Sequence, residues 1–345
     1  MDNERGLLDL IIARLGARFG GRLGEFSYRE KLLLCESFAS ERDFLRRSAA
    51  DIEALIGRKL AAPWNIDEVR RLAERDEKQA RLRGINWVSW RSPAYPPLLR
   101  EIYDPPAVLF FKGSLPNPEA PLAAIVGTRK PSPQSAAWAY RIARDLARAG
   151  VSVVSGLALG VDAMAHRGNI EGGAPTVAAL GSGLDNVYPS SNRTLARRIL
   201  ETGGCLLSEY PPGTGPRKWN FPARNRIISG LARGVLIVEA PEKSGALITA
   251  RFALEHNREL WVASCGLAED NGRRAAGSFT AFDRRGSTKL AEEGAEIIRD
   301  ASDILKAWNM ETAESEPEEE TAGGVSASGG LALAASLARA LGVTM

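Results

Sequence analysis

Six consecutive residues, Phe-Pro-Ala-Arg-Asn-Arg at 221–226, combine an aromatic ring, a rigid proline and two guanidinium groups, and Arg-Lys at 217–218 precedes them. Because unpaired cations are costly to bury, we predict a loop that leads into a helix at Arg224 or Asn225. A helix start favours negative charge, so cations gathered there indicate that an anion binds between them. The ring of Phe221 could stack on a base. A solvated arginine cluster with this ring in the core is the alternative that these residues leave open.

The elements that would position this stretch form a repeating pattern of short apolar runs and amphipathic segments from residue 122 onward. Near-continuous apolar runs are typical of strands buried on both faces, and strands that alternate with helices form a parallel sheet. We therefore predict an α/β protein with a doubly wound, mostly parallel, Rossmann-like sheet. The predicted strands are residues 123–127, 151–155, 176–180, 205–208, 235–239 and 260–264, and the predicted helices include 134–148, 161–171, 193–201 and 245–256.

Glycines and cations follow these strands at the edge of the sheet where ligands bind in such folds. Glycine lets backbone amides approach phosphate oxygens, and Lys and Arg side chains add formal charge. One glycine turn is ordinary in this fold class, but the same composition after the first five strands favours an anion or nucleic-acid site. The candidate DNA contacts are Gly127, Arg129, Lys130, Ser155, Gly156, Lys218, Phe221, Arg224, Arg226, Lys243, Ser244 and Gly245.

Several enzyme classes lack their sequence signatures here. The first strand turn has no Gly-x-Gly-x-x-Gly, and no P-loop motif occurs, which argues against a dinucleotide oxidoreductase and a P-loop hydrolase. Asp162 and His166 lie four apart on a predicted helix, where a local ion pair or a cap is the expected role. Two histidines and three dispersed cysteines predict neither a zinc site nor a disulfide framework. We expect a binding protein with no catalytic residues, cofactor or metal.

Charge is distributed unevenly along the 345 residues, whose formal net charge is +3. Six glutamates lie within residues 311–320, and without them 45 basic residues face 36 acidic ones, a balance of +9. The remainder of the chain is therefore basic enough to suit a polyanion. No signal peptide and no apolar run long enough to span a membrane are evident, so we expect a cytoplasmic protein.

The chain divides by composition into four parts. Residues 1–82 read as a small helical domain, similar to sterile-alpha-motif or helix-hairpin-helix modules, which would either bind DNA or protein or simply cap the core. Residues 83–121 read as an extended connector with two short strands, at 85–90 and 107–113. Residues 122–308 form the predicted Rossmann-like DNA-binding domain, and 309–345 an acidic tail that we expect to be disordered apart from one short helix.

The ordered motifs of residues 84–305 resemble those of the DprA/Smf family. This resemblance implies a Rossmann-like core that binds single-stranded DNA, protects incoming DNA during natural transformation, forms a homodimer and helps to load the RecA recombinase. The motifs are Val126-Gly127-Thr128-Arg129, residues 155–162, Tyr188-Pro189, Ser208-Glu209, residues 221–228 and residues 244–250.

The family's DNA pocket, carried over by position, adds Asn225 to the candidates and repeats Gly127, Arg129, Lys218, Phe221, Arg224 and Lys243. We regard Arg129 and Lys218 as the principal DNA ligands. Arg224 could instead be internal and bond to Glu209 or Glu239.

The chain also departs from the family pattern. Ser264-Cys265-Gly266 replaces the usual Pro-Gly, residues 267–285 are long and arginine-rich, and 286–291 lack the usual Asn and Ile. These changes put the local loop geometry in doubt. We expect the family's frequent C-terminal winged-helix domain to be absent.

Other functions remain open at this stage. Phosphoribohydrolases share this variety of Rossmann fold, but they use a Pro-Gly-Gly-x-Gly-Thr motif with a glutamate, whereas residues 243–249 here read Lys-Ser-Gly-Ala-Leu-Ile-Thr. Nucleotide binding without turnover is the third alternative.

Overall fold

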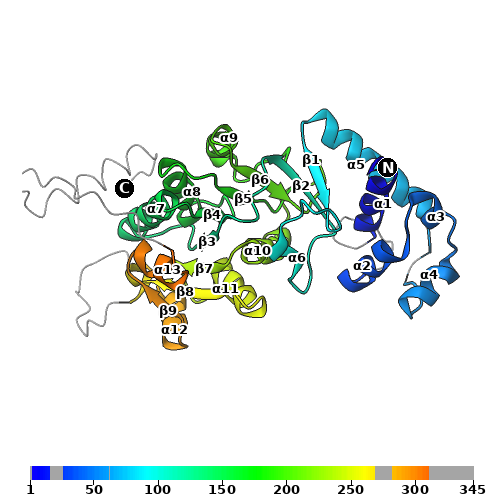
Figure 1. Ribbon diagram of the computed structural model, residues 1–345. Helices are drawn as coiled ribbons and strands as arrows, with labels where there is room; N and C mark the ends of the chain where they lie inside the picture. The colour runs from blue at the N-terminus through cyan, green and yellow to red at the C-terminus, as the bar shows by residue number, and fades with distance from the viewer. Residues whose placement is uncertain (1, 16–25, 62, 269–281, 311–345) are drawn as a thin grey trace, which may run out of the picture.

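The computed structural model describes residues 2–15, 26–61, 63–268 and 282–310 (Figure 1). Within these ranges nine strands form one sheet in the order β1-β2-β6-β5-β4-β3-β7-β8-β9. The seven strands from β6 to β9 in this order run parallel, whereas β1 and β2 are antiparallel additions at one edge. This confirms the predicted doubly wound, mostly parallel α/β fold. The strands are β1 Asn86–Ser89, β2 Val108–Gly113, β3 Leu122–Val126, β4 Ser152–Ser155, β5 Val177–Ala179, β6 Cys205–Ser208, β7 Gly234–Ile237, β8 Glu259–Ala263 and β9 Glu296–Ile298.

Helices cover both faces of the sheet, as the burial of successive strand residues requires. Ala123 and Ile125 of β3 pack into a cluster with α7, α8 and α13, whereas Ala124 and Val126 pack into another with α10 and α11. This alternation follows from the two-residue period of a strand. The helices are α6 Pro97–Arg100, α7 Pro133–Arg148, α8 Val161–Glu171, α9 Arg193–Glu201, α10 Asn220–Leu231, α11 Gly245–Glu255, α12 Arg285–Glu292 and α13 Ala301–Ala307.

The predicted connector contributes its two strands to the sheet. β2 pairs with β6 in the register Phe110 opposite Ser208, and β1 pairs with β2. In the segment that joins β1 to β2, Tyr95 is fully buried and donates its hydroxyl hydrogen to the Pro106 carbonyl at 2.9 Å. Residues 83–121 are therefore continuous with the core sheet and do more than link two domains.

The N-terminal region is helical, as predicted. It contains α1 Asp2–Arg14, α2 Tyr28–Ser37, α3 Glu41–Leu45, α4 Ala49–Ile56 and α5 Ile66–Leu82. Capping boxes at Ser27 and Ser48 fix the starts of α2 and α4, each typically worth about 1 kcal/mol. The kinship with sterile-alpha-motif or helix-hairpin-helix modules stays a prediction.

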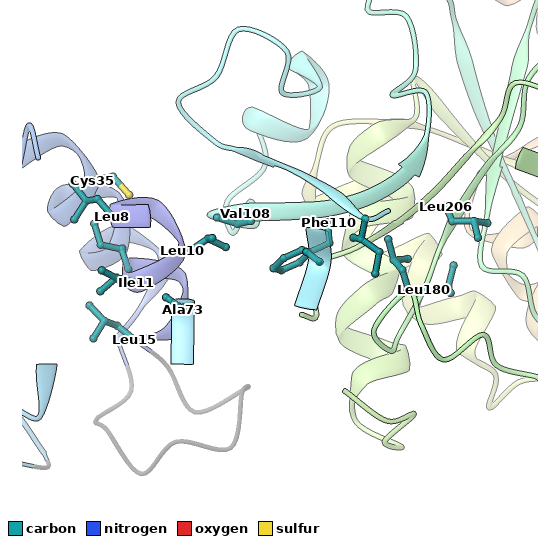
Figure 2. Packing of buried hydrophobic residues seen from close by; sticks show 14 of the residues in the cluster. Leu8, Leu10, Ile11, Leu15, Cys35, Ala73, Val108, Phe110, Leu180 and Leu206 are labelled. Carbon is teal, nitrogen blue, oxygen red and sulfur yellow. The ribbon is translucent and has the colours of Figure 1, made fainter. Parts of the chain in front are cut away.

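The helical region packs directly against the sheet. Figure 2 follows one apolar cluster from Leu10 of α1 through Val108 and Phe110 of β2 to Leu180 and Leu206. A polar contact accompanies this cluster: the Arg91 guanidinium, in the segment after β1, donates to the Asp9 carboxylate of α1 at 2.6 Å. α1 and α5 are thereby held close to the loops that follow β5 and β6.

The acidic tail and most of the arginine-rich stretch at 267–285 lie outside the described residues. In the ranges that the structure covers, every helix is too short or too polar to cross a bilayer.

Candidate nucleic-acid interface

The turn after β3 is tightly packed. Thr128 donates its amide hydrogen to the Glu239 carbonyl at 2.8 Å, and its own carbonyl accepts from Val161 at 3.2 Å. A Cβ on Gly127 would lie 2.6 Å from a methyl carbon of Val161, so the close approach requires glycine. The two residues that follow Thr128, Arg129 and Lys130, are exposed.

Helix α10 begins at Asn220, four or five residues before the predicted start at Arg224 or Asn225. Asn220 is buried and donates its side-chain amide to the Gly181 carbonyl at 2.9 Å, which fixes the helix start. Pro222 fits in this first turn because its missing N–H would have no partner within the helix. The prediction of a later start was wrong, and Arg224 and Arg226 consequently lie inside the helix and face the core.

Arg224 is a buried cation. Its guanidinium donates to the Ala179 carbonyl and lies against Gly156, where a Cβ would clash with it. Burial lowers the pKa of Arg224 to about 10, which leaves it charged at neutral pH, and the nearby Asp162 opposes that shift. The predicted bonds to Glu209 or Glu239 are not the ones found here.

Asp162 is neither the partner of His166 nor the cap of α8, whose N-cap is Gly160, so neither expected role is the one found. Its carboxylate accepts from the amides of Gly156 at 3.1 Å and Ala158 at 3.3 Å. His166 is instead 2.8 Å from the Thr176 hydroxyl, and burial lowers the pKa of His166 to about 3. This network sets the shape of the loop after β4.

Arg226 forms the ion pair that the sequence had suggested for Arg224. Its guanidinium donates to both oxygens of Glu209, at 2.9 and 2.7 Å, and to the Asp104 carbonyl at 2.9 Å. Both Arg226 and Glu209 are buried. Burial alone would lower the pKa of Arg226, but the carboxylates of Glu209 and Asp104 outweigh it and raise the pKa above its ordinary value. The pair joins the loop after β6 to the segment between β1 and β2.

Two further candidates also bond internally through their side chains. Asn225 donates to the Gly245 carbonyl at 3.0 Å, which ties α10 to the start of α11. Ser155 is fully buried and donates its hydroxyl hydrogen to the Ile125 carbonyl at 2.7 Å. These side chains hold the loops in place beneath the surface.

The exposed candidates form a rim of cations, which we define as Arg129, Lys130, Lys218 and Lys243. Ser244 and Gly245 begin α11 beside Lys243, and a Cβ on Gly245 would meet open space. The rim residues follow β3, β6 and β7. Strands β3 and β7 are neighbours in the sheet, whereas β4 and β5 separate β6 from β3. The segment after β6 still reaches the β3 turn, because the Phe221 ring lies 6.0 Å from the Arg129 guanidinium carbon. A polyanion could therefore contact several of them at once.

Aromatic rings lie beside this rim. The Phe221 ring centroid is 6.0 Å from the Arg129 guanidinium carbon and 5.5 Å from the Tyr188 ring, at an interplanar angle of 46°. Tyr188 is 43% exposed and Trp219 is 64% exposed, so both rings offer a face to solvent. Sequence reasoning did not select these two as site residues, although Tyr188 lies in a quoted motif and Trp219 stands two residues before Phe221.

Of the residues that depart from the family pattern, those on either side of 269–281 are described, and they bond to one another and to the core. Ser287 is buried and donates its hydroxyl hydrogen to the Gly266 carbonyl at 2.6 Å, while the same hydroxyl accepts from Ala240 at 3.3 Å. Arg284 donates to the Leu267 carbonyl and to the Ser132 hydroxyl, each at 3.2 Å. The start of α12 is thereby tied to the ends of β7 and β8 without the usual asparagine.

Metal-binding chemistry has no support in the part of the chain that the structure describes, where no three His, Cys, Asp or Glu residues gather as ligands.

The fold and the site together define a Rossmann-like α/β protein with a cationic, aromatic rim at the carboxyl edge of its sheet. The chain belongs to the DNA recombination-mediator protein A family, whose model matches residues 86–309.

Relatives with known names support this membership. Protein Smf from Synechocystis sp. is 39% identical over 258 residues, which cover 74% of this chain and 59% of the relative. The DNA processing protein DprA from Bacillus subtilis is 40% identical over 227 residues, covering 66% of this chain and 72% of that one. The matched part is thus well short of the full length of these relatives.

Solved structures agree with the fold. The chain is similar to DNA processing protein A from Streptococcus pneumoniae, with a TM-score of 0.65 and 30% identity, covering 90% of this chain and 98% of the other. It is also similar to DNA processing protein A from Helicobacter pylori, at a TM-score of 0.54 and 30% identity, covering 65% and 96%. The latter structure is described as revealing a unique single-stranded DNA binding mode.

Proposed function

We propose that this chain binds single-stranded DNA at the rim and its aromatic neighbours, protects incoming DNA in natural transformation and helps to load the RecA recombinase. It acts in the cytoplasm as a homodimer, by binding and not by catalysis, and needs no cofactor or metal. The single observation that carries this proposal is the Phe221 ring, set between Arg129 and the exposed ring of Tyr188. Family membership and the description of the Helicobacter pylori structure support it.

The exposed residues divide into two chemical roles. Arg129, Lys130, Lys218 and Lys243 neutralise phosphates, and each neutralised phosphate releases counterions, which makes binding salt-dependent. Phe221 and Tyr188 stack on bases, which requires bases that are not paired in a duplex. Ser244 and Gly245 present the start of α11 to the strand, and Gly127 keeps the β3 turn close to Val161 so that Arg129 follows at the surface.

The buried candidates support binding indirectly. The side chains of Arg224, Asn225, Arg226 and Ser155 contact protein groups and fix the loops that present the rim. Gly156 leaves room for the Arg224 guanidinium. Arg224 also adds positive charge close to Arg129, as their electrostatic interaction indicates.

A phosphoribohydrolase would need a glutamate free to act at the edge of the sheet. Glu209 is paired with Arg226, and Glu239 is buried and accepts from the amide and hydroxyl of Ser132. Both arrangements favour a structural role for these carboxylates, and the binding function is preferred.

Replacing Phe221 with alanine should weaken single-strand binding by about 1–3 kcal/mol, because base stacking is worth this amount for each base. Phe221→Trp should retain most of the affinity, since it keeps an aromatic face. Binding is measured by fluorescence anisotropy with a labelled oligothymidylate. Phe252→Ala, at a partly buried ring on α11, serves as the matched control. Equal affinity of Phe221→Ala and wild type would argue against base stacking at this position.

A further inference from the structure

A basic cavity, separate from the rim, lies between the helical region and the loop after β6. Its volume is about 350 Å³. Its lining includes Arg14 of α1, Arg75 and Gln79 of α5 with the C-cap residue Arg83, and Arg217 with residues 212–215 of the loop. None of these residues belongs to the rim.

The contribution of α5 is a straight stripe along one helix face. Arg75, Gln79 and Arg83 are spaced by four residues, so successive side chains lie on one side at a rise of about 6 Å per step. Arg75 is 60% exposed, and its recorded charge contact is a long one, 3.9 Å to Asp76. It can therefore turn toward a ligand at little cost.

Positive charge is in excess around the cavity. Among the described residues, Asp76 forms a buried pair with Arg14, and Asp185 lies 3.4 Å from Arg83. These two pairs balance in charge, and the exposed Arg75 and Arg217 add positive charge beyond them. Guanidinium groups gathered in this way match a phosphate group, which accepts paired hydrogen bonds.

The cavity and the rim share one loop. Arg217 lines the cavity and stands next to Lys218 of the rim, and its guanidinium carbon is 5.6 Å from the exposed Trp219 ring. The loop is held from below by the residues after β5, because Gly183 donates to the Thr214 carbonyl at 2.8 Å and Gly213 to Asp185 at 3.0 Å. The segment after β5 also carries Tyr188, so the Lys218 and Tyr188 part of the proposed DNA site and the cavity rest on the same two loops.

We propose that this cavity binds a phosphodiester group of the same single strand that occupies the rim. The inference rests on the proposed function and extends it: the N-terminal helical region forms a second part of the DNA site, reached by the strand as it passes over Lys218 and Trp219. Short strands fill the rim alone, whereas longer strands also reach Arg75 and Arg83.

The test compares oligothymidylates of roughly 6 and roughly 20 nucleotides, lengths below and above common single-strand site sizes. Arg75→Gln should lower the affinity for the longer strand about fivefold and reduce its salt slope by about 0.7, the value for one phosphate contact. The affinity for the shorter strand should not change. Arg75→Gln/Arg83→Gln should deepen the loss on the longer strand only.

The matched control is Arg81→Gln, an exposed arginine of the same helix that does not line the cavity. It should leave both affinities as in the wild type. Unchanged binding of the longer strand by the Arg75 and Arg83 variants would overturn the inference while leaving the rim intact, and so would an equal loss on both lengths. A wild-type protein that binds neither strand would refute the proposed function and this extension together.

Discussion

Replacing Arg226 with methionine should lower the free energy of unfolding by about 3–5 kcal/mol. The substitution removes the guanidinium that balances the negative charge of Glu209 and donates hydrogen bonds to both of its oxygens. The carboxylate stays buried, because both side chains are at most 6% exposed. Arg226→Lys should be intermediate, because an ammonium keeps the charge but not the two-point geometry. Chemical denaturation of the purified variants measures this effect.

Two comparisons separate this effect from a loss of surface charge. Arg251→Met breaks a pair of similar length with Glu255, at 2.7 Å, but Arg251 is 80% exposed, so the change should cost less than about 1 kcal/mol. Adding Glu209→Gln to Arg226→Met should recover part of the lost stability, since the uncompensated charge is removed. A stable Arg226→Met protein that had lost only DNA affinity would instead make Arg226 a direct DNA ligand.

Replacing Arg129 and Lys218 together with alanine should lower the affinity for single-stranded DNA roughly 100-fold, if each charged contact is worth about 1.4 kcal/mol. The slope of log affinity against log salt should become shallower by about 1.4, or 0.7 for each phosphate no longer neutralised. Both side chains are exposed, so the fold should be unaffected. A salt series of anisotropy titrations measures both quantities.

The control for this double variant is Arg148→Ala/Arg197→Ala. These arginines are 59% and 71% exposed and lie at the end of α7 and on α9, away from the rim, so the change in net charge is the same. It should alter affinity only weakly, through the overall field. If both double variants lost affinity equally, binding would depend on net charge and not on the rim.

The sheet could be predicted from sequence because its signals are local. Six of the seven parallel strands were predicted from short apolar runs, as at 122–126 and 205–208, whereas the short edge strand β9, Glu296–Ile298, was not predicted because it is largely exposed. The antiparallel strand β2 was predicted as a strand, but its place beside β6 depends on residues about a hundred positions apart, such as Phe110 and Ser208. Local pattern carries no information on such a pairing.

The candidate site was predicted in composition but not in exposure. In the sequence, Arg224 and Arg226 cannot be told apart from exposed cations. They face the core because α10 already starts at Asn220. Their partners are Ala179 at the end of β5 and Glu209 in the loop after β6, both distant in sequence, so the sequence alone could not distinguish an internal contact from a DNA contact. The exposed ring of Trp219 was missed for a different reason: tryptophan is on average a highly buried residue, so its type did not indicate a surface position.

The most direct test of the account is the binding of one labelled oligonucleotide, as a single strand and as its duplex, to the wild-type protein at matched salt concentrations. An exposed aromatic pair between cations predicts preference for the single strand, since paired bases cannot stack on Phe221 and Tyr188. Tighter binding of the single strand at every salt concentration is the expected result. Equal affinity for both forms would contradict the account, because it would reduce the rim to a non-specific cationic surface.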